Sequence, residues 1–288
     1  MMRIAAGLLF LPAIIGGIFF ARRNTKLGRG DRRGAMRLAI FILALSASAW
    51  ILRLPDVSFL SLFLSPYLAV LIWILYMAVE PFVRRRWPGV LVSWTRLLSG
   101  EWRDPLLARD MFVGFAFGAL VCCINCIVAA IPSRISWAGF NYLPPINLNA
   151  ILGARFTAAE FLDGFSTEIG IGLVFVCLLV TMRLLLRNQW AAIIAIVLIG
   201  ATAFAAGPIA GSIVTASFMF LVMRFGLIAG IAFWFSYGSI YSSFATLQST
   251  WYSGYGFLSL AVFAALVLYS FRTSLGGRPL ISTPHLDD

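Results

Sequence analysis

The chain has 288 residues, of which 61% are hydrophobic and only 11% are charged, and its formal net charge is +11. Soluble proteins carry about 25% charged residues, so this composition excludes an ordinary soluble domain and indicates a protein embedded in a membrane. In a soluble protein the positive charge would indicate nucleic-acid binding. Here the arginines lie in short loops beside apolar runs, where they set orientation and contact anionic lipid headgroups. We therefore expect a lipid partner and no nucleic acid.

In chain order, about nine apolar runs have the length of membrane-spanning helices, which need roughly 20 mostly apolar residues. The sequence predicts an all-α fold, a polytopic integral membrane helical bundle of about nine transmembrane helices in one domain over residues 1–288. The predicted spans are residues 4–20, 38–54, 59–79, 111–131, 169–186, 190–206, 209–224, 227–244 and 255–271.

Two of these predictions need a reason beyond apolar length. The run at residues 4–20 looks like a signal peptide, but it lacks a small-x-small cleavage site and basic residues follow it, so we interpret it as a retained span. The run at residues 209–244 is too long for one span. An arginine at a span centre costs about 2.5–3.5 kcal/mol, so the run is expected to divide near Arg224. A division into eight spans remains the alternative.

The arginines also predict orientation, because cytoplasmic loops are rich in Arg and Lys. With nine spans, the two large basic loops and the basic residues near 183–187, 224 and 272–278 all fall on the cytoplasmic side. The other side receives Arg53, which could pair with Asp56 at the outer turn, and acidic residues further along. We expect a bacterial inner-membrane protein with its N-terminus outside and its C-terminus cytoplasmic. Eight spans would place the C-terminus outside.

Two long loops interrupt the spans. Residues 132–168 are predicted to be external, and residues 80–110 are predicted to be cytoplasmic. In the second loop, a helix over residues 88–98 would place Trp87 and Trp94 on one apolar stripe with arginines on either side. This pattern is typical of an amphipathic helix that lies among lipid headgroups. We therefore expect a cytoplasmic interfacial helix anchored by these two tryptophans.

The residue inventory excludes the common catalytic sites. His285 is the single histidine, whereas a zinc protease helix needs two and a serine triad needs one as its base. A protein-kinase site needs a lysine, an H-R-D-like loop and a D-F-G-like metal ligand, and the single lysine lies in the first loop. We expect a non-catalytic protein without a cofactor or metal. An intramembrane enzyme would need acids such as Glu160, Asp163 or Glu168 to reach into the bundle.

Two further features have competing interpretations. Cys122, Cys123 and Cys126 form a C-C-x-x-C pattern on one predicted span, but no histidine or fourth ligand is near. We interpret them as small, polarizable packing residues and not as a metal or redox site. Arg224 is the candidate for a functional buried charge, although its side chain could instead extend to the inner surface from the end of a span.

Several strings in the loops and the tail resemble one protein family. They lie at residues 21–24, 28–35, 80–88, 93–98, 103–106, 224–227, 251–252 and 271–280. Together they resemble the C-terminal multispan region of bacterial, acidobacterial-type membrane serine/threonine protein kinases, from end to end of the chain. The chain departs from that family by lacking the kinase domain, and Ala108 stands where glycine is expected.

The resemblance implies a non-catalytic membrane module of a bacterial signalling system, acting as an anchor, sensor or docking component for a kinase-like partner. The alternative is a small-solute transporter or channel, in which Gly207 and Pro208 would break a helix at a binding site. The candidate cytoplasmic docking and membrane-interface residues are Arg84, Arg85, Arg86, Trp87, Trp94, Arg96, Arg103 and Asp104.

Overall fold

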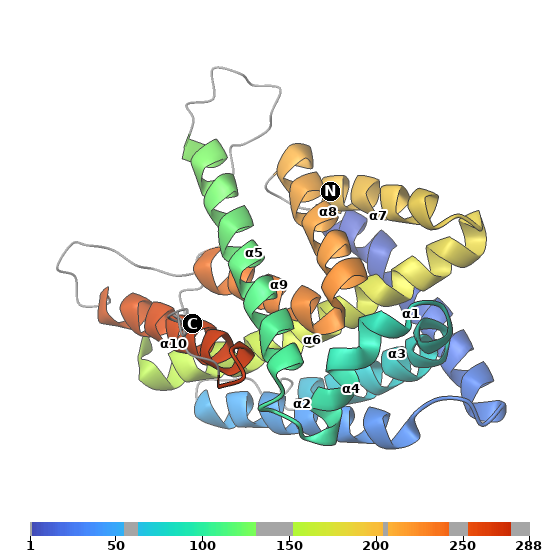
Figure 1. Ribbon diagram of the computed structural model, residues 1–288, viewed down its shortest axis with the longest axis horizontal. Coiled ribbons are helices and arrows are strands. Elements are labelled where there is room, and N and C mark those ends of the chain that lie inside the picture. The colour runs from blue at the N-terminus through green and yellow to red at the C-terminus, as the bar shows by residue number, and fades with distance from the viewer. Residues whose placement is uncertain (1, 55–62, 131–151, 204–206, 242–252, 278–288) are drawn as a thin grey trace, which may run out of the picture.

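The described part of the chain consists of helices and turns (Figure 1). The structure is a computed structural model that describes residues 2–54, 63–130, 152–203, 207–241 and 253–277. No strand occurs in these ranges, which confirms the predicted all-α fold. The elements are α1 (Met2–Lys26), α2 (Arg32–Leu52), α3 (Leu64–Arg86), the 3-10 helix η2 (Pro88–Leu91), α4 (Val92–Ser99), α5 (Pro105–Ala130), α6 (Ala154–Leu186), α7 (Gln189–Ala203), α8 (Pro208–Phe225), α9 (Leu227–Tyr241) and α10 (Ser253–Ser274).

Six described helices, α2, α3, α5, α6, α8 and α10, have both the length and the apolar composition needed to cross a bilayer. α7 and α9 are also apolar, with 15 described residues each, and each continues to the edge of a described range, at Ala203 and Tyr241. The chain has the construction of a multi-pass integral membrane protein, and nine crossings remain a prediction.

Several helices extend beyond the predicted spans. α3 continues to Arg86, and α5 begins at Pro105 instead of residue 111. α6 begins at Ala154, so the predicted external loop is wrong for residues 154–168, while residues 132–151 lie outside the described part. Apolar composition marks only the section of a helix that lipid can cover, whereas the backbone hydrogen bonds of a helix can continue past it.

The predicted division at Arg224 is confirmed. α8 ends at Phe225 and α9 begins at Leu227. Gly226 between them has a φ of 99°, a conformation that glycine adopts without strain. A Cβ at this position would also lie only 2.9 Å from the carbonyl oxygen of Val90. The break therefore depends on glycine for both its conformation and its contact with η2.

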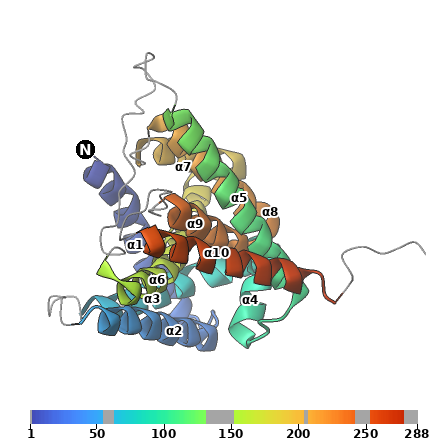
Figure 2. The same ribbon diagram turned by 90° about the vertical axis from the view of Figure 1, so that its left-hand side faces the viewer.

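α6 runs between two groups of packed helices. It contacts α1, α2 and α3 on one side and α7 and α9 on the other, while α5 packs against α9 and α10. The helices are not parallel: α5 rises steeply in Figures 1 and 2, whereas α2 lies close to horizontal in both. Since no single direction runs along all of the helices, the number of crossings does not follow from helix length alone.

α5 and α9 make the closest helix contact among the described elements. A Cβ on Gly114 would lie 2.3 Å from the carbonyl oxygen of Ala229, and one on Gly118 would lie 2.4 Å from that of Phe233. Two glycines four residues apart let helix backbones approach closely in membranes. The hydroxyl of Ser236 also donates to the carbonyl of Phe115 at 2.8 Å. Backbone contact of this kind fixes α9 against α5.

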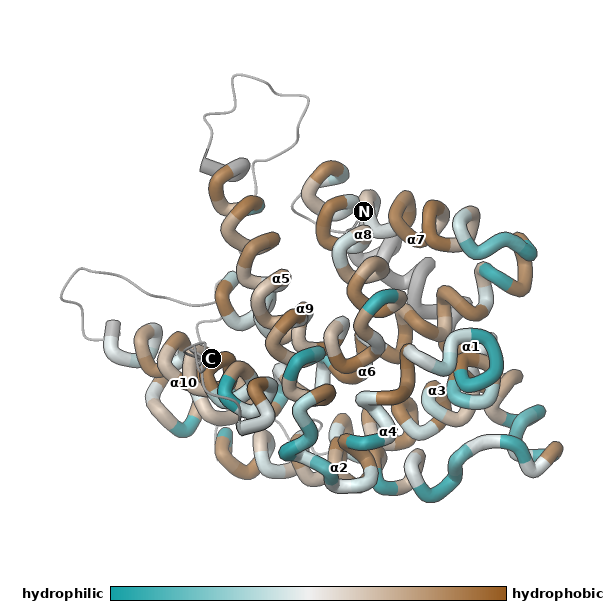
Figure 3. The backbone as a smooth tube through the Cα atoms, in the orientation of Figure 1, coloured by the Kyte–Doolittle hydropathy of each residue, from teal (hydrophilic) through white to brown (hydrophobic). Residues whose placement is uncertain are grey.

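The surface of the helices is apolar away from their ends. Figure 3 shows hydrophobic residues along the helices and hydrophilic residues mainly at helix ends and turns. Large side chains such as Phe19, Leu185, Leu198 and Leu268 are exposed. An apolar surface this extensive is unusual for a soluble monomer, but it is what a lipid-facing bundle requires.

Candidate functional site

One face of the η2–α4 segment packs against the rest of the protein, while Val92 on the same segment is 39% exposed. Val90, Leu91 and Trp94 are almost fully buried, with Trp94 only 1% exposed. The ring centroids of Trp94 and Tyr76 lie 6.4 Å apart. The predicted apolar stripe is therefore present, but the prediction that Trp94 anchors it in the bilayer is wrong. Periodicity identifies an apolar face but does not show what covers it. Here other helices of the protein cover the face that contains Trp94.

Trp87 is likewise held by protein. Its indole Nε1 donates to the side-chain oxygen of Gln189 at 3.3 Å, and the guanidinium of Arg183 lies 5.3 Å from the centre of the indole ring. The ring also packs edge-on against Phe82. Trp87 therefore joins the end of α3 to the turn between α6 and α7. Its side chain stays partly exposed, and its role as a membrane anchor stays a prediction.

A buried carboxylate ties the first basic loop to α3. Glu80 is 3% exposed. It accepts hydrogen bonds from the backbone N–H of Asp31 at 3.3 Å and pairs with Arg84 at 2.6 Å. Asp31 in turn accepts from the N–H of Gly34 at 2.8 Å and so caps α2. The side-chain amide of Asn24 adds a bond to the carbonyl of Met77 at 3.0 Å.

Arg96 and Asp104, both predicted docking residues, pair with each other at 2.5 Å. Asp104 also accepts hydrogen bonds from the N–H groups of Leu106 and Leu107, at 2.8 and 3.0 Å, at the start of α5. Desolvation acts to raise the pKa of Asp104, but the N–H of Leu107, Arg96 and the N–H of Leu106 together hold that pKa below 3.8. The pair closes the α4–α5 turn and is not free to bind a partner.

A second buried carboxylate holds α4 on α5. Asp110 is 2% exposed and accepts a hydrogen bond from the hydroxyl of Ser93. Its other oxygen accepts from the guanidinium of Arg109 at 2.9 Å. The contacts of Glu80, Asp104 and Asp110 thus hold residues 80–110 in one folded segment. We call this segment the cover.

The exposed arginines lie on the outer side of this cover. Arg85, Arg86 and Arg103 are exposed and form no ion pair with any described residue. Other helix ends join the same region, because Arg37 of α2 donates to the carbonyl of Leu98 at 3.1 Å. We call the exposed surface of Arg85, Arg86 and Arg103 the basic face. Other exposed basic residues, at helix ends and turns, are Arg22, Arg23, Lys26, Arg29, Arg32, Arg33, Arg37, Arg84, Arg109, Arg187, Arg224 and Arg272.

Arg224 is not the buried charge that the sequence offered as a candidate. Its side chain is exposed, and its guanidinium lies 5.9 Å from the ring centre of Phe225. The residue stands in the last turn of α8, where a cation is favoured by the helix dipole. The other interpretation, a side chain that extends outward from a helix end, describes the structure.

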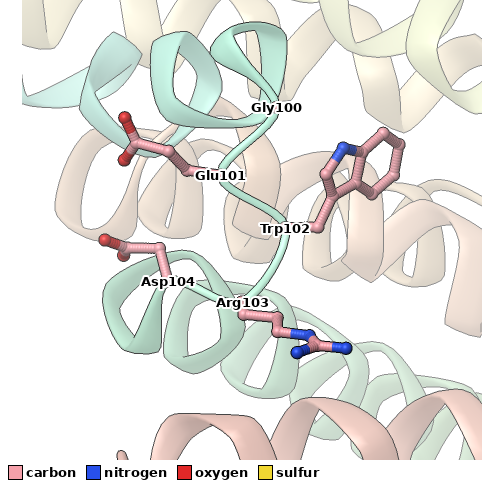
Figure 4. A pocket seen from close by; sticks show the side chains of 5 residues that line it. All are labelled: Gly100, Glu101, Trp102, Arg103 and Asp104. Atoms are coloured by element: carbon pink, nitrogen blue, oxygen red, sulfur yellow. The ribbon is translucent and has the colours of Figure 1, made fainter.

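A shallow depression of about 460 Å³ lies on the turn between α4 and α5. Figure 4 shows Trp102 and Arg103 directed to one side of this turn and Glu101 and Asp104 to the other. Trp102 is 57% exposed, and the hydroxyl of Tyr269 donates to its carbonyl at 3.4 Å. The exposed tryptophan of the α4–α5 turn is thus Trp102, which the sequence reasoning missed. Its signal was the neighbouring Arg103.

A second cluster of charged residues lies between α2 and α6. Arg53, at the end of α2, pairs with Glu160 at 2.8 Å and also with Asp163, both on α6. Arg155 donates to the carbonyl of Leu54 at 2.9 Å. The predicted partner Asp56 lies outside the described residues. α2 and α6 are therefore joined by an ion-pair cluster at the ends predicted to be external.

None of the four cysteines forms a disulfide. Cys122 and Cys177 are buried, whereas Cys123 and Cys126 are exposed on α5. Among the described residues no group of three or more His, Cys, Asp or Glu side chains is placed to hold a metal ion. The packing interpretation therefore describes Cys122, but it is wrong for Cys123 and Cys126, whose side chains lie on the surface of α5.

Comparisons of the chain with protein-family models, curated proteins and solved structures found no match. The site must therefore be interpreted from its own chemistry. It is a strongly cationic surface in which Glu80, Asp104 and Asp110 are already paired with arginines, so it can bind anionic groups by charge-assisted hydrogen bonds.

Proposed function

We propose that this multi-pass membrane protein is a non-catalytic docking module whose basic face binds an acidic surface of a cytoplasmic signalling protein. The observation that supports it most is the exposure of Arg85, Arg86 and Arg103 on a folded cover in which the carboxylates of Glu80, Asp104 and Asp110 are paired with arginines. A surface that is ordered before binding loses less conformational entropy when a partner docks. A disordered basic loop would not have that advantage.

The kinase-like nature of the partner comes from the sequence resemblance alone. Its strings at residues 80–88 and 103–106 coincide with the cover and its exposed arginines. We further propose a bacterial inner membrane, nine crossings that include α1, α7 and α9, and the basic face on the cytoplasmic side, because arginine-rich loops are retained there.

The orientation can be tested with cysteine labelling. In spheroplasts, a membrane-impermeant maleimide should label R155C from outside and should label R86C only after lysis. The variants are made after alanine replaces Cys122, Cys123, Cys126 and Cys177. Labelling of R86C in intact spheroplasts would refute the proposed orientation.

Docking can be tested with the full-length protein in nanodiscs of neutral lipid, offered cytosolic proteins of the source cell. We expect the wild type to retain kinase-type signalling proteins, identified by mass spectrometry, and R85A/R86A/R103A to lose them. R155A, at the opposite end, is the matched control and should retain them. Retention should fall as salt rises, because exposed charges are screened. Equal retention by the triple variant would rule out this surface.

A transporter or channel is the second candidate. One observation favours it: Gly207, with φ 96°, starts α8 directly before Pro208. Short or interrupted helices form substrate sites in several transporters. Uptake of labelled amino acids, sugars and monovalent cations into proteoliposomes would support this candidate. Absence of flux for all three classes would count against it.

A further inference from the structure

One carboxylate of α6 lies in the seam between α6 and α9. Glu168 is half-buried as a whole, but its oxygen Oε2 is enclosed and accepts no hydrogen bond from the described part of the chain. Its other oxygen, Oε1, lies 3.3 Å from where a Cβ on Gly238 would stand. The carboxylate therefore sits directly against the backbone of α9, where glycine leaves space for it.

The rest of this seam is apolar. Phe165, one turn before Glu168, stacks on Phe235 with 4.1 Å between ring centroids. One turn after it, a Cβ on Gly172 would lie 3.0 Å from the side chain of Ile231. The enclosed oxygen of this carboxylate thus lies in a seam of packed rings and aliphatic side chains, while the side chain as a whole stays partly exposed.

The charged side chains nearby do not neutralise it. Asp163 and Glu160 are on the same helix, and both are engaged by Arg53. Asp163 is also five residues away from Glu168, about 7.5 Å along the helix axis. The described ionisable side chains at this level of the helices packed on α6 are Arg53 on α2, Tyr67 on α3, Tyr237 and Tyr241 on α9, and Tyr255 on α10.

An isolated ionised carboxylate in an apolar interior is strongly disfavoured, and such a group becomes neutral instead. Metal cations need several oxygen ligands, and no group of three acidic or other metal-ligating side chains occurs among the described residues. We propose that Glu168 is a proton-binding site within the bundle, occupied in the folded protein at neutral pH. Buried acids of this kind serve as proton relays in membrane proteins. The inference does not depend on the docking surface.

A hydrophobic carbodiimide tests the proposal, because it adds to a protonated carboxyl group within apolar surroundings. The acid proton moves to a carbodiimide nitrogen while the carboxyl oxygen bonds to the central carbon, so nothing leaves. With the purified full chain in detergent, we expect mass spectrometry to find the adduct on Glu168 and none in E168Q. The paired acids Glu160 and Asp163 are internal controls and should stay unmodified. The yield should fall as pH rises.

Thermal unfolding provides an independent measurement if the reagent cannot enter. The unfolded chain releases this proton above about pH 4.3, whereas the folded protein retains it, so stability must fall as pH rises. We expect the melting temperature of the wild type to drop relative to E168Q by a few degrees between about pH 5 and about pH 8.

A pH-independent difference between the wild type and E168Q, or protection from carbodiimide by sodium or potassium at constant pH, would overturn the proposal. The first result would mean that no proton is bound. The second would mean that a metal cation occupies the site. A pH-dependent difference without such protection supports proton binding whether or not the reagent reacts.

Discussion

Replacement of Gly114 by alanine should separate α5 from α9. The added Cβ would lie 2.3 Å from the carbonyl oxygen of Ala229, whereas real contacts are at least 3.0 Å. The helices must therefore move apart locally by at least 0.7 Å, the difference between these two distances. A gap of 0.5–1 Å removes roughly a quarter to a half of the dispersion energy of each contact that it opens.

The expected loss of stability follows from these contacts. Overpacking of a close contact costs about 1–3 kcal/mol. The hydrogen bond from Ser236 to the Phe115 carbonyl, one residue further along α5, would stretch as well, and such bonds in membranes contribute about 0.6 kcal/mol on average. We expect G114A to lower the unfolding free energy by about 2–3 kcal/mol.

Unfolding of the full chain in detergent can be followed by maleimide labelling of Cys122, which is buried on α5, after alanine replaces Cys123, Cys126 and Cys177. G114A should expose this thiol at a lower temperature than the wild type does. G254A is the matched control, because a Cβ at Gly254 meets nothing within 4 Å, and alanine is the better helix former. A G114A protein as stable as G254A would show that the close α5–α9 contact is not present.

Three further changes test other parts of the structure. R53Q removes the guanidinium that pairs with Glu160 and Asp163. We expect the unfolding free energy to fall by about 1–2 kcal/mol and the melting temperature to fall with it. The variant R53Q/E160Q/D163N should recover part of this loss. The lowered pKa of Asp104 adds stability that is present above pH 3.8 and is lost as pH falls through the pKa of the folded protein. When acid unfolding is followed by circular dichroism, D104N should remove this part of the pH dependence. Thr215 is fully buried, and its hydroxyl has no hydrogen-bond partner among the described residues. T215V should therefore leave the unfolding free energy unchanged or raise it by up to about 1 kcal/mol. A marked fall in the melting temperature would contradict the burial of an unpaired hydroxyl.

The contrast between Trp94 and Trp102 shows how far sequence reasoning reached at the basic face. Both tryptophans lie beside arginines in one segment, and the helical pattern of Trp94 made it the better candidate for a membrane anchor. The structure buries Trp94 against Tyr76 and exposes Trp102. Amphipathic spacing specifies that an apolar face will be covered, but lipid and protein satisfy that requirement equally.

The sequence alone determined the helical class, most helix positions and the gathering of arginines into particular turns. These properties are local: apolar length decides whether a helix can cross a bilayer, and the cost of burying an arginine decides where an apolar run divides. Only the tertiary structure decided that Arg53 meets Glu160, that Gly114 contacts α9 and that Glu168 is enclosed. Those outcomes depend on which helix faces meet across roughly a hundred residues of chain, and a pattern within one helix contains no information about its partner.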